Sequence, residues 1–368
     1  MADTKKLFAT SDLNDKTIGG WKIISKFSSP DIQKNETGGN FSSCYKVEKN
    51  GEIAFMKVLD FEKILSFGGI MSVTDAMQQA STEFNYEKTL SQHCINNKTT
   101  KIVCYIDSGE EILNGYSVSG SVPYIIYEMA DGDVRHTMDF SNKAELIAKI
   151  TSLTQKIKSL HDVSVGISQL HNLDISHQDI KPSNILSFKE EYKIGDLGRS
   201  LIFDNSIVCP YPMRFNGDRT YAAPECFFPN FVPSQEALYQ VDNYMLGGLI
   251  VFYITGVTFN LLLHKFLPIN LRYLKYKQVQ NYDYVIPDFL NAYQKALIEF
   301  ENEIPLENIK KDLVSLVAYL CHPDPQKRGH KKIVNTNSKI PNYDLQNIIQ
   351  ELDLIQRKAE ISLLHLKK

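Results

Sequence analysis

One uncharged stretch restricts the folds open to this chain more than any other feature. The sequence YMLGGLIVFYITGVTFNLLL, residues 244–263, has no charged side chain over twenty residues, about the length that crosses a bilayer. Glycine, threonine and asparagine interrupt it, Asp242 lies just before it, and neither end carries a cluster of basic residues. We therefore expect a buried core helix in a large helical domain, in preference to a membrane span.

Composition narrows the class of protein. The 368 residues are 43% hydrophobic and 23% charged, which is typical of a globular chain long enough for two lobes or domains. The net charge of −3, without a dense Lys/Arg run, predicts no nucleic-acid or membrane partner. Six cysteines without a C-x-x-C pair indicate reduced thiols and a cytoplasmic protein, and an N-terminus without an apolar segment argues against a signal peptide.

Hydrophobic patterning divides the chain into a strand-rich part and a helical part. Residues 21–59 favour strands, with Asn50-Gly51 as a hairpin turn, and residues 73–93 favour a helix. Residues 142–173 have helical spacing and predict two helices, and the chain beyond them predicts two short strands and then mostly helix. We expect an α+β, bilobal fold with a hinge near residues 129–132. The expected parts are an N-terminal extension (1–20), a β-rich lobe (21–130), a helical lobe (131–332) and a C-terminal helical extension (333–368).

Three motifs supply, in order, the groups that phosphoryl transfer needs. FMKV places Lys57 on a strand, where an ammonium can reach phosphate oxygens. HQDIKPSN supplies Asp179 as an acceptor for a hydroxyl proton, Lys181 as a cation and Asn184 as a neutral oxygen ligand, and KIGDLG supplies Asp196 as an anionic one. The set predicts a phosphotransferase with Asn184 and Asp196 as its metal ligands.

These motifs resemble those of eukaryotic-type Ser/Thr protein kinases, from about Trp21 to about Lys332. HQDIKPSN resembles H-R-D-L-K-P-x-N, DLG resembles D-F-G, and APE at residues 223–225 is the A-P-E triplet. Asp242 is similar to the aspartate that braces the catalytic loop in that family. Arg328 is similar to the arginine that pairs with the A-P-E glutamate, here Glu225.

The resemblance implies the bilobal kinase fold, ATP and Mg²⁺ as cofactors, and protein Ser/Thr hydroxyls as acceptors, autophosphorylation included. It implies that Asp179 accepts the proton, that Lys181 steadies the transferring group, and that Lys57 holds the phosphates with a glutamate partner. Glu87 is the preferred partner and Glu83 the rival. The hinge backbone of Glu128, Met129 and Ala130 would bind adenine, Asp133 would meet the ribose, and Tyr127 would be the gatekeeper.

The sequence departs from the family pattern in three places. Thr37 and Ser42 take the outer positions of the glycine-rich loop, only Gly39 keeps the middle one, and Gly38 adds freedom beside it. We therefore expect weaker nucleotide binding but not its loss. Gln178 replaces the arginine that meets an activation-loop phosphate, so we expect control that does not need that phosphate. Asp218 stands where a threonine is usual, and Thr220 is the alternative for its task.

Other interpretations stay open at this point. A pseudokinase scaffold would explain the degraded glycine loop, and another ATP-dependent transferase would use the same groups. The apolar seam of residues 345–359 predicts a helix that docks on its own domain, with self-association or partner docking as the alternative. The Lys/Asn/Ile-rich composition would also suit an effector delivered to a host cytosol.

Overall fold

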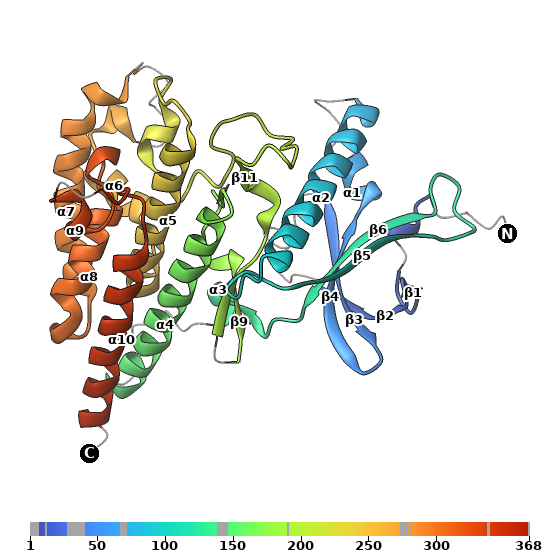
Figure 1. Cartoon of the computed structure of the whole chain (residues 1–368), viewed down its shortest axis with the longest axis horizontal. Coiled ribbons are helices and arrows are strands. Elements are labelled where there is room, and N and C mark those ends of the chain that lie inside the picture. Colours follow the sequence, from blue (N-terminus) through green and yellow to red (C-terminus); the bar gives the residue numbers. More distant parts are fainter. Residues whose placement is uncertain are drawn as a thin grey trace. The chain divides into compact units, whose positions relative to one another are not determined.

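The chain folds into two compact units, residues Met1–Ala130 and Asp131–Lys368. The computed structural model describes residues 7–11, 13–27, 41–66, 72–137, 146–189, 191–272, 279, 281–336 and 339–366. Unit 1 is built round a β-sheet, and unit 2 consists mainly of helices (Figure 1). The predicted α+β, bilobal fold is confirmed.

The described part of unit 1 contains a six-stranded sheet and two α-helices. The sheet has the order β1-β2-β3-β4-β6-β5, and each neighbouring pair is antiparallel. The elements are a 3-10 turn (Ala9–Ser11), β1 (Thr17–Ile18), β2 (Trp21–Lys26), β3 (Ser42–Lys49), β4 (Glu52–Leu59), α1 (Phe61–Ser66), α2 (Val73–Asn96), β5 (Tyr105–Ile112) and β6 (Ser121–Glu128).

A two-residue turn fixes the register that positions Lys57. Asn50 and Gly51 both have positive φ, 55° and 85°, which is the conformation that a tight hairpin between twisted strands requires. The turn pairs Lys49 with Glu52, and the ladder then pairs Cys44 with Lys57. The predicted hairpin turn is confirmed.

The first described residues, from Leu7 on, contribute to the core of unit 1. Phe8 forms a bridge with Ser119, and Phe8 and Leu13 are each 1% exposed. Strand β1 pairs with β2, and Leu13 joins the cluster of buried side chains on one face of the sheet. Residues 7–11 and 13–20, which lie within the N-terminal extension that the sequence predicts (1–20), thus fold together with the sheet.

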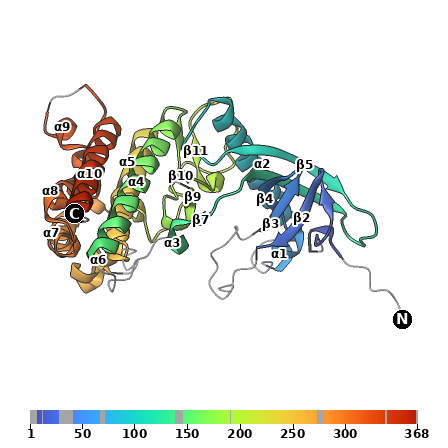
Figure 2. The same ribbon diagram turned by 90° about the horizontal axis from the view of Figure 1, so that it is seen from below.

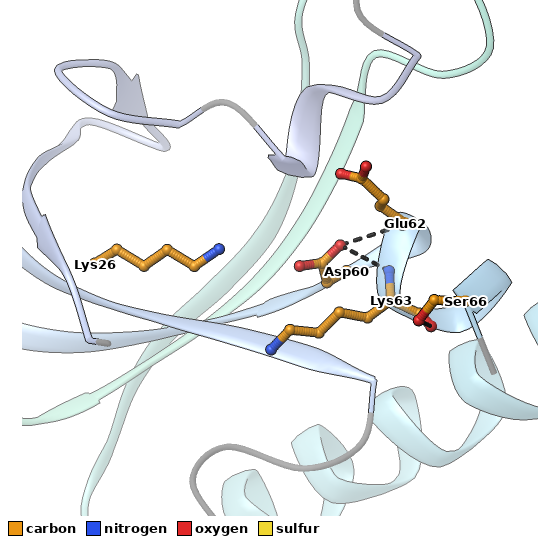
Figure 3. A pocket seen from close by; sticks show the side chains of 5 residues that line it. All are labelled: Lys26, Asp60, Glu62, Lys63 and Ser66. Carbon is orange, nitrogen blue, oxygen red and sulfur yellow. Dashed lines mark hydrogen bonds between the residues drawn. The ribbon is translucent and has the colours of Figure 1, made fainter. Parts of the chain in front are cut away.

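The strand that carries Lys57 ends at a helix cap. Asp60 is buried, and its carboxylate accepts hydrogen bonds from the Glu62 and Lys63 amides at the start of α1 and from the Ser43 hydroxyl. A pocket of about 230 Å³ lies beside this cap, lined by Lys26 and Ser66 as well (Figure 3). Because the Asp60 carboxylate already has these three partners, we interpret its role as structural.

Unit 2 is a helical bundle with short strands. Its elements are β7 (Gly132–Asp133), α3 (Val134–Thr137), α4 (Leu146–His171), β8 (Ile175–Ser176), β9 (Ile185–Phe188), β10 (Glu191–Ile194), β11 (Leu201–Ile202), α5 (Gln235–Thr255), α6 (Phe259–Phe266), α7 (Ile286–Glu303), α8 (Glu307–Leu320), α9 (Lys331–Val334) and α10 (Gln346–Leu366). Short 3-10 turns lie at Pro182–Asn184, Leu197–Arg199, Pro224–Phe227, Ile269–Leu271, Tyr282–Tyr284 and Pro325–Lys327.

Two helices form the centre of unit 2. The prediction of two helices over residues 142–173 is wrong, because α4 continues unbroken from Leu146 to His171. Helix α5 contains most of the uncharged stretch and is buried along most of its length, and it packs against α4 (Figure 1 and Figure 2). Among the described residues no single helix meets the length and hydropathy of a membrane span, whereas α5 and α6, bent by 87°, meet them as a pair.

The C-terminal helix packs on its own unit. Helix α10 lies along α4 and also contacts α8 (Figure 1). The seam side chains Ile348, Leu352, Ile355 and Ala359 are each 0% exposed. Intramolecular docking, the preferred interpretation of the apolar seam, is confirmed.

A charged cluster fastens α10 to the preceding segment. The Glu351 carboxylate accepts hydrogen bonds from His330 Nε2 at 2.6 Å and from Lys331 Nζ at 2.9 Å. Burial raises the pKa of Glu351, but the hydrogen bonds from His330 and Lys331 outweigh it, so the pKa lies below its ordinary value of 4.5. The cluster therefore stabilises the fold above about pH 4.5, and this contribution disappears as the pH falls through the lowered value.

We expect Glu351→Gln to lower the free energy of unfolding by about 1–2 kcal/mol at pH 7, because it removes two charge-assisted hydrogen bonds. Asp353→Asn is the matched control, since Asp353 forms an exposed pair with Arg357 on the same helix and should change stability by less than about 0.5 kcal/mol. Urea unfolding at pH 7 and pH 3.5 measures both variants. Equal losses in the two variants at pH 7 would contradict the assignment.

Candidate functional site

In unit 1, Lys57 forms a buried ion pair with Glu87. Lys57 comes from β4 and Glu87 from α2, and the Lys57 Nζ lies 2.7 Å from both carboxylate oxygens of Glu87. Both residues are less than 10% exposed. Glu83, the rival partner, instead accepts a hydrogen bond from Gln79 on the same helix. The register of α2 thus brings Glu87, one turn later, to the lysine.

Tyr127 supports this pair from the neighbouring strand. Its hydroxyl donates to Glu87 Oε1 at 3.3 Å and lies 3.1 Å from the Ser91 hydroxyl, one turn further along α2. A glutamate held by both a cation and a phenol has little freedom to rotate away. Tyr127 therefore joins β6 to α2 as well as being the predicted gatekeeper.

The predicted adenine-binding segment follows β6. The Glu128 amide donates to Cys104 C=O, and the Glu128 carboxylate accepts from the Cys104 amide, so the strand end is fixed on both sides. Met129 and Ala130 lie beyond the strand. Asp133, the predicted ribose contact, belongs to unit 2, where β7 pairs it with Leu186 of β9. Gly38 and Gly39, the predicted glycine-loop residues, lie outside the described residues.

In unit 2, the buried carboxylate of Asp242 fixes the loop that carries Asp179. Asp242 is 0% exposed and comes from α5. Its Oδ2 accepts from the His177 amide at 3.0 Å and its Oδ1 from the Gln178 amide at 2.7 Å, while His171 Nε2 lies 3.0 Å from Oδ2. The bracing role that the resemblance implies for Asp242 agrees with these contacts.

His177 connects this loop to the segment that carries Asp196. Its Nδ1 accepts a hydrogen bond from the Asp179 amide at 3.2 Å, which leaves Nε2 as the protonated nitrogen. Nε2 lies 3.1 Å from Gly195 C=O and donates to it. One imidazole thus links the backbones just before Asp179 and just before Asp196.

Asp179 lies among donors that hold its carboxylate in one orientation. Oδ1 accepts from the Asp218 amide at 3.0 Å. Oδ2 accepts from Asn184 Nδ2 at 3.0 Å and lies 3.1 Å from Lys181 Nζ. The side chain is nearly buried, so rotation would break several charge-assisted hydrogen bonds. The structure brings three predicted site residues, Asp179, Lys181 and Asn184, into contact.

Lys181 is held in its charged form. Burial lowers the pKa of Lys181, but the charge of Asp179 and the hydrogen bond that the ammonium donates to it, followed by the charges of Asp218 and Asp196, outweigh it and raise the pKa. The Asp218 carboxylate lies 3.7 Å from the ammonium. A permanent positive charge therefore stands next to the Asp179 carboxylate.

Asn184 and Asp196 offer a donor set that fits Mg²⁺. Asn184 Nδ2 donates to both Asp179 C=O and Asp179 Oδ2, which leaves the amide oxygen as the ligand atom. Asp196 is exposed and adopts a left-handed backbone conformation with φ 57°. One neutral and one anionic oxygen suit a hard cation that completes its shell with phosphate and water oxygens.

Gln178 bonds to the segment that follows Asp196. Its Oε1 accepts from the Asn216 amide at 3.0 Å, and its side chain is fully buried at φ 63°. Its Nε2 is buried without a hydrogen-bond partner among the described residues. Gly217 is required beside it, since a Cβ there would lie 1.7 Å from Gln178 C=O. An uncharged hydrogen bond thus holds this segment, residues 196–225, against the loop.

Asp218 occupies the place of the usual threonine. Its amide contacts Asp179 and its carboxylate faces Lys181. The Thr220 amide donates to Asp218 Oδ1, and Thr220 is exposed. Of the two candidates, Asp218 makes the contacts with Asp179 and Lys181.

The end of the same segment is fixed by a buried ion pair. Arg328 is 0% exposed, and its two terminal nitrogens lie 2.6 and 3.1 Å from the Glu225 carboxylate oxygens. It also donates to the carbonyls of Gln240 and His322. The pairing of Arg328 with Glu225, expected from the resemblance, is confirmed.

Sequence reasoning missed two parts of this site. His171 lies beside Asp242 and stacks on Tyr239 with ring centroids 3.8 Å apart, yet a lone histidine at a helix end gives no signal of that contact. Asn216 acts through its backbone amide, which no side-chain pattern reveals. Only the close approach of the chain at Gly217 hints at it.

Known protein kinases resemble parts of this chain. The chain is 30% identical over 141 residues to the mouse testis-specific serine/threonine-protein kinase 1, over 36% of this chain and 38% of that protein. It is 27% identical over 220 residues to the Xenopus tropicalis inhibitor of nuclear factor kappa-B kinase subunit alpha, over 56% and 27%. It is 30% identical over 128 residues to the Arabidopsis thaliana mitogen-activated protein kinase kinase 7, over 34% and 41%. In each case the chain spans less than half of the relative's length.

The family match is broader than any of these. Residues 37–337 match the protein kinase domain, and that range contains Lys57, Glu87, Asp179, Asn184 and Asp196. A match over most of the chain, together with the two-part fold and the contacts round Asp179, leads to one conclusion. The chain belongs to the protein kinase domain family.

Proposed function

We propose that this protein is an active kinase that transfers the γ-phosphate of ATP to serine or threonine hydroxyls of proteins, itself included. The observation that carries the proposal is the environment of Asp179. A carboxylate oriented by Lys181, Asn184 and the Asp218 amide suits the task of accepting a hydroxyl proton. The Ser/Thr preference follows the name of one similar protein, the mouse testis-specific serine/threonine-protein kinase 1.

The other predicted residues have matching tasks in this proposal. Lys57, oriented by Glu87, would hold the α- and β-phosphates, and the backbone of residues 128–130 would hold adenine. Lys181, charged at neutral pH, would steady the γ-phosphoryl group. Asn184 and Asp196 would hold Mg²⁺, which when bound neutralises phosphate charge.

We further propose that activity does not require a phosphate on the segment of residues 196–225. The Gln178 side chain already bonds to the Asn216 amide, and Arg328 with Glu225 fixes the segment's end. Glutamine has no charge with which to answer a phosphate dianion. The segment is thus held by contacts that exist before any modification.

Asp179→Asn tests the proposed reaction. The amide keeps the shape but cannot take a proton, so the rate of protein phosphorylation should fall by about 10²- to 10⁴-fold. Radiolabel transfer to the protein itself and to generic substrates measures this rate. The melting-temperature shift caused by ATP and Mg²⁺ should persist in the variant, since nucleotide binding does not need the base. Equal label transfer by both proteins would overturn the proposal.

Glu87→Gln and Glu83→Gln form a matched pair on one helix. Removal of the Glu87 charge weakens a buried ion pair, so kcat/KM should fall by about 10- to 100-fold, the equivalent of about 1.5–3 kcal/mol. Glu83→Gln should leave kcat/KM within about twofold, because Glu83 contacts only Gln79 among the hydrogen bonds described. Steady-state kinetics with varied ATP decides between them, and a larger loss in the Glu83 variant would reverse the assignment.

Gln178 variants test the proposed control. Phosphatase-treated protein should remain active without Gln178→Arg. Gln178→Leu should speed amide exchange at residues 214–218 and lower activity about 5- to 10-fold, because the half-buried Asn216 amide loses its acceptor. Gln356→Leu is the control, because Gln356 is a half-buried glutamine on α10 that donates to Glu360 on the same helix. Activity found only in the Gln178→Arg variant would refute the proposed control.

A further inference from the structure

We propose that a cationic pocket in unit 2, next to Asp179, binds an acidic side chain of the substrate polypeptide and so selects acceptor hydroxyls that have acidic neighbours. The inference rests on the proposed kinase function and names its substrate class. The proposal is based on three arginines that line one pocket of the folded chain. In the sequence they are spread over twenty-one positions.

The pocket has a charged rim and an aromatic lining. It encloses about 510 Å³, and Arg199, Arg214 and Arg219 line it together with Phe215, Phe228 and Phe231. No acidic residue is among the described residues that line it. The lining therefore carries three formal positive charges and an apolar surface, a combination that suits an anionic group attached to a carbon chain.

The three arginines have no carboxylate partner in the described part of the chain. Arg214 Nε donates to the Asn216 amide oxygen at 3.3 Å, and Arg219 lies over the Phe227 ring. By contrast, Arg328 and Arg357 of the same unit each pair with a carboxylate. All three pocket arginines are exposed, so their guanidinium groups are accessible to an anion from outside.

The wall of the pocket continues into the contacts of Asp179. Asn216 and Gly217 line the pocket, and the amide of the next residue, Asp218, donates to Asp179 Oδ1. Gly217 also lies directly on the Gln178 carbonyl. An extended polypeptide advances about 3.3 Å per residue. A side chain a few residues from an acceptor hydroxyl at Asp179 can therefore reach the arginines.

The chemistry favours a carboxylate of a polypeptide. Planar guanidinium groups bind carboxylate and phosphate oxygens in a forked geometry, so aspartate, glutamate and a phosphorylated side chain share this recognition. The charges gather at one pocket and form no stripe along an element, as a nucleic-acid backbone would need. The net charge of −3 gives no general attraction for polyanions, so recognition would be local.

A peptide series with one serine acceptor tests the pocket. Glutamate is placed at each of four positions on either side in an alanine background, and glutamine, lysine and phosphoserine replace it in the matched peptides. Phosphorylation rates are compared for the native chain, for the triple variant Arg199→Gln/Arg214→Gln/Arg219→Gln and for the control Arg357→Gln. The single variants Arg214→Gln and Arg219→Gln are included in case the triple variant melts at a lower temperature.

We expect glutamate, and phosphoserine more strongly, to raise kcat/KM by about tenfold over glutamine at one or two positions. Each arginine removed should reduce that preference about twofold, and the triple variant should lose it while its rate on the glutamine peptide stays the same. Salt near 0.5 M should reduce the native preference, because it screens exposed charges. The Arg357→Gln control should keep the full preference.

Peptides with alanine in place of the acceptor serine separate this inference from the kinase function. Their binding, measured by fluorescence anisotropy without ATP, should be tighter for glutamate than for glutamine only when the three arginines are present. Such binding without any phosphorylation would support the pocket and refute the kinase function. Phosphorylation without an acidic preference, or a preference that survives the triple variant, would overturn the pocket.

Discussion

The carboxylate of Asp242 is the contact on which the rest of unit 2's site depends. It is fully buried in α5 and receives the amides of His177 and Gln178 together with the His171 ring. A buried charge persists only when it is saturated with donors, so helix and loop fix each other. These bonds also hold Gln178 at φ 63°, a conformation that costs free energy unless its surroundings impose it. Because the Gln178 backbone is fixed in this way, the orientation of the next residue, Asp179, is fixed as well.

The loop is hydrogen-bonded to two other parts of unit 2, the segment before Asp196 and the residues around Gly217. The His177 ring links the Asp179 amide to Gly195 C=O, just before the proposed Mg²⁺ ligand Asp196. The Gln178 side chain and the Asp179 carboxylate receive the amides of Asn216 and Asp218. Neighbouring residues of one loop thereby hold the proposed base Asp179, the proposed metal ligand Asp196 and the segment of residues 196–225. Preorganisation of this kind is what positional catalysis needs, since little covalent work falls to the protein.

The sequence predicted what depends on side-chain identity at fixed spacing. The Asn50-Gly51 turn, the Arg328–Glu225 pair and the buried helix α5 follow from residue types whose conformational or charge requirements are local or carried by a motif. Contacts made by backbone groups that only the fold brings together could not be predicted from the sequence. The Asn216 amide at Gln178 has no sequence signature. The single helix α4 was divided wrongly because uneven apolar spacing does not by itself end a helix that tertiary packing supports.

Burial explains why an uncharged residue can stand at position 178. The site is fully buried, and a guanidinium there would need a carboxylate or phosphate to offset its desolvation. Glutamine leaves one buried Nε2 unsatisfied, which costs far less than an unpaired charge, and its Oε1 still holds the Asn216 amide. Positive charge is instead found at Arg199, Arg214 and Arg219, which are exposed and line the pocket proposed to bind an acidic side chain. In this arrangement, neutral hydrogen bonds hold the segment of residues 196–225 in place. The three arginines are then available for the proposed recognition of an acidic side chain.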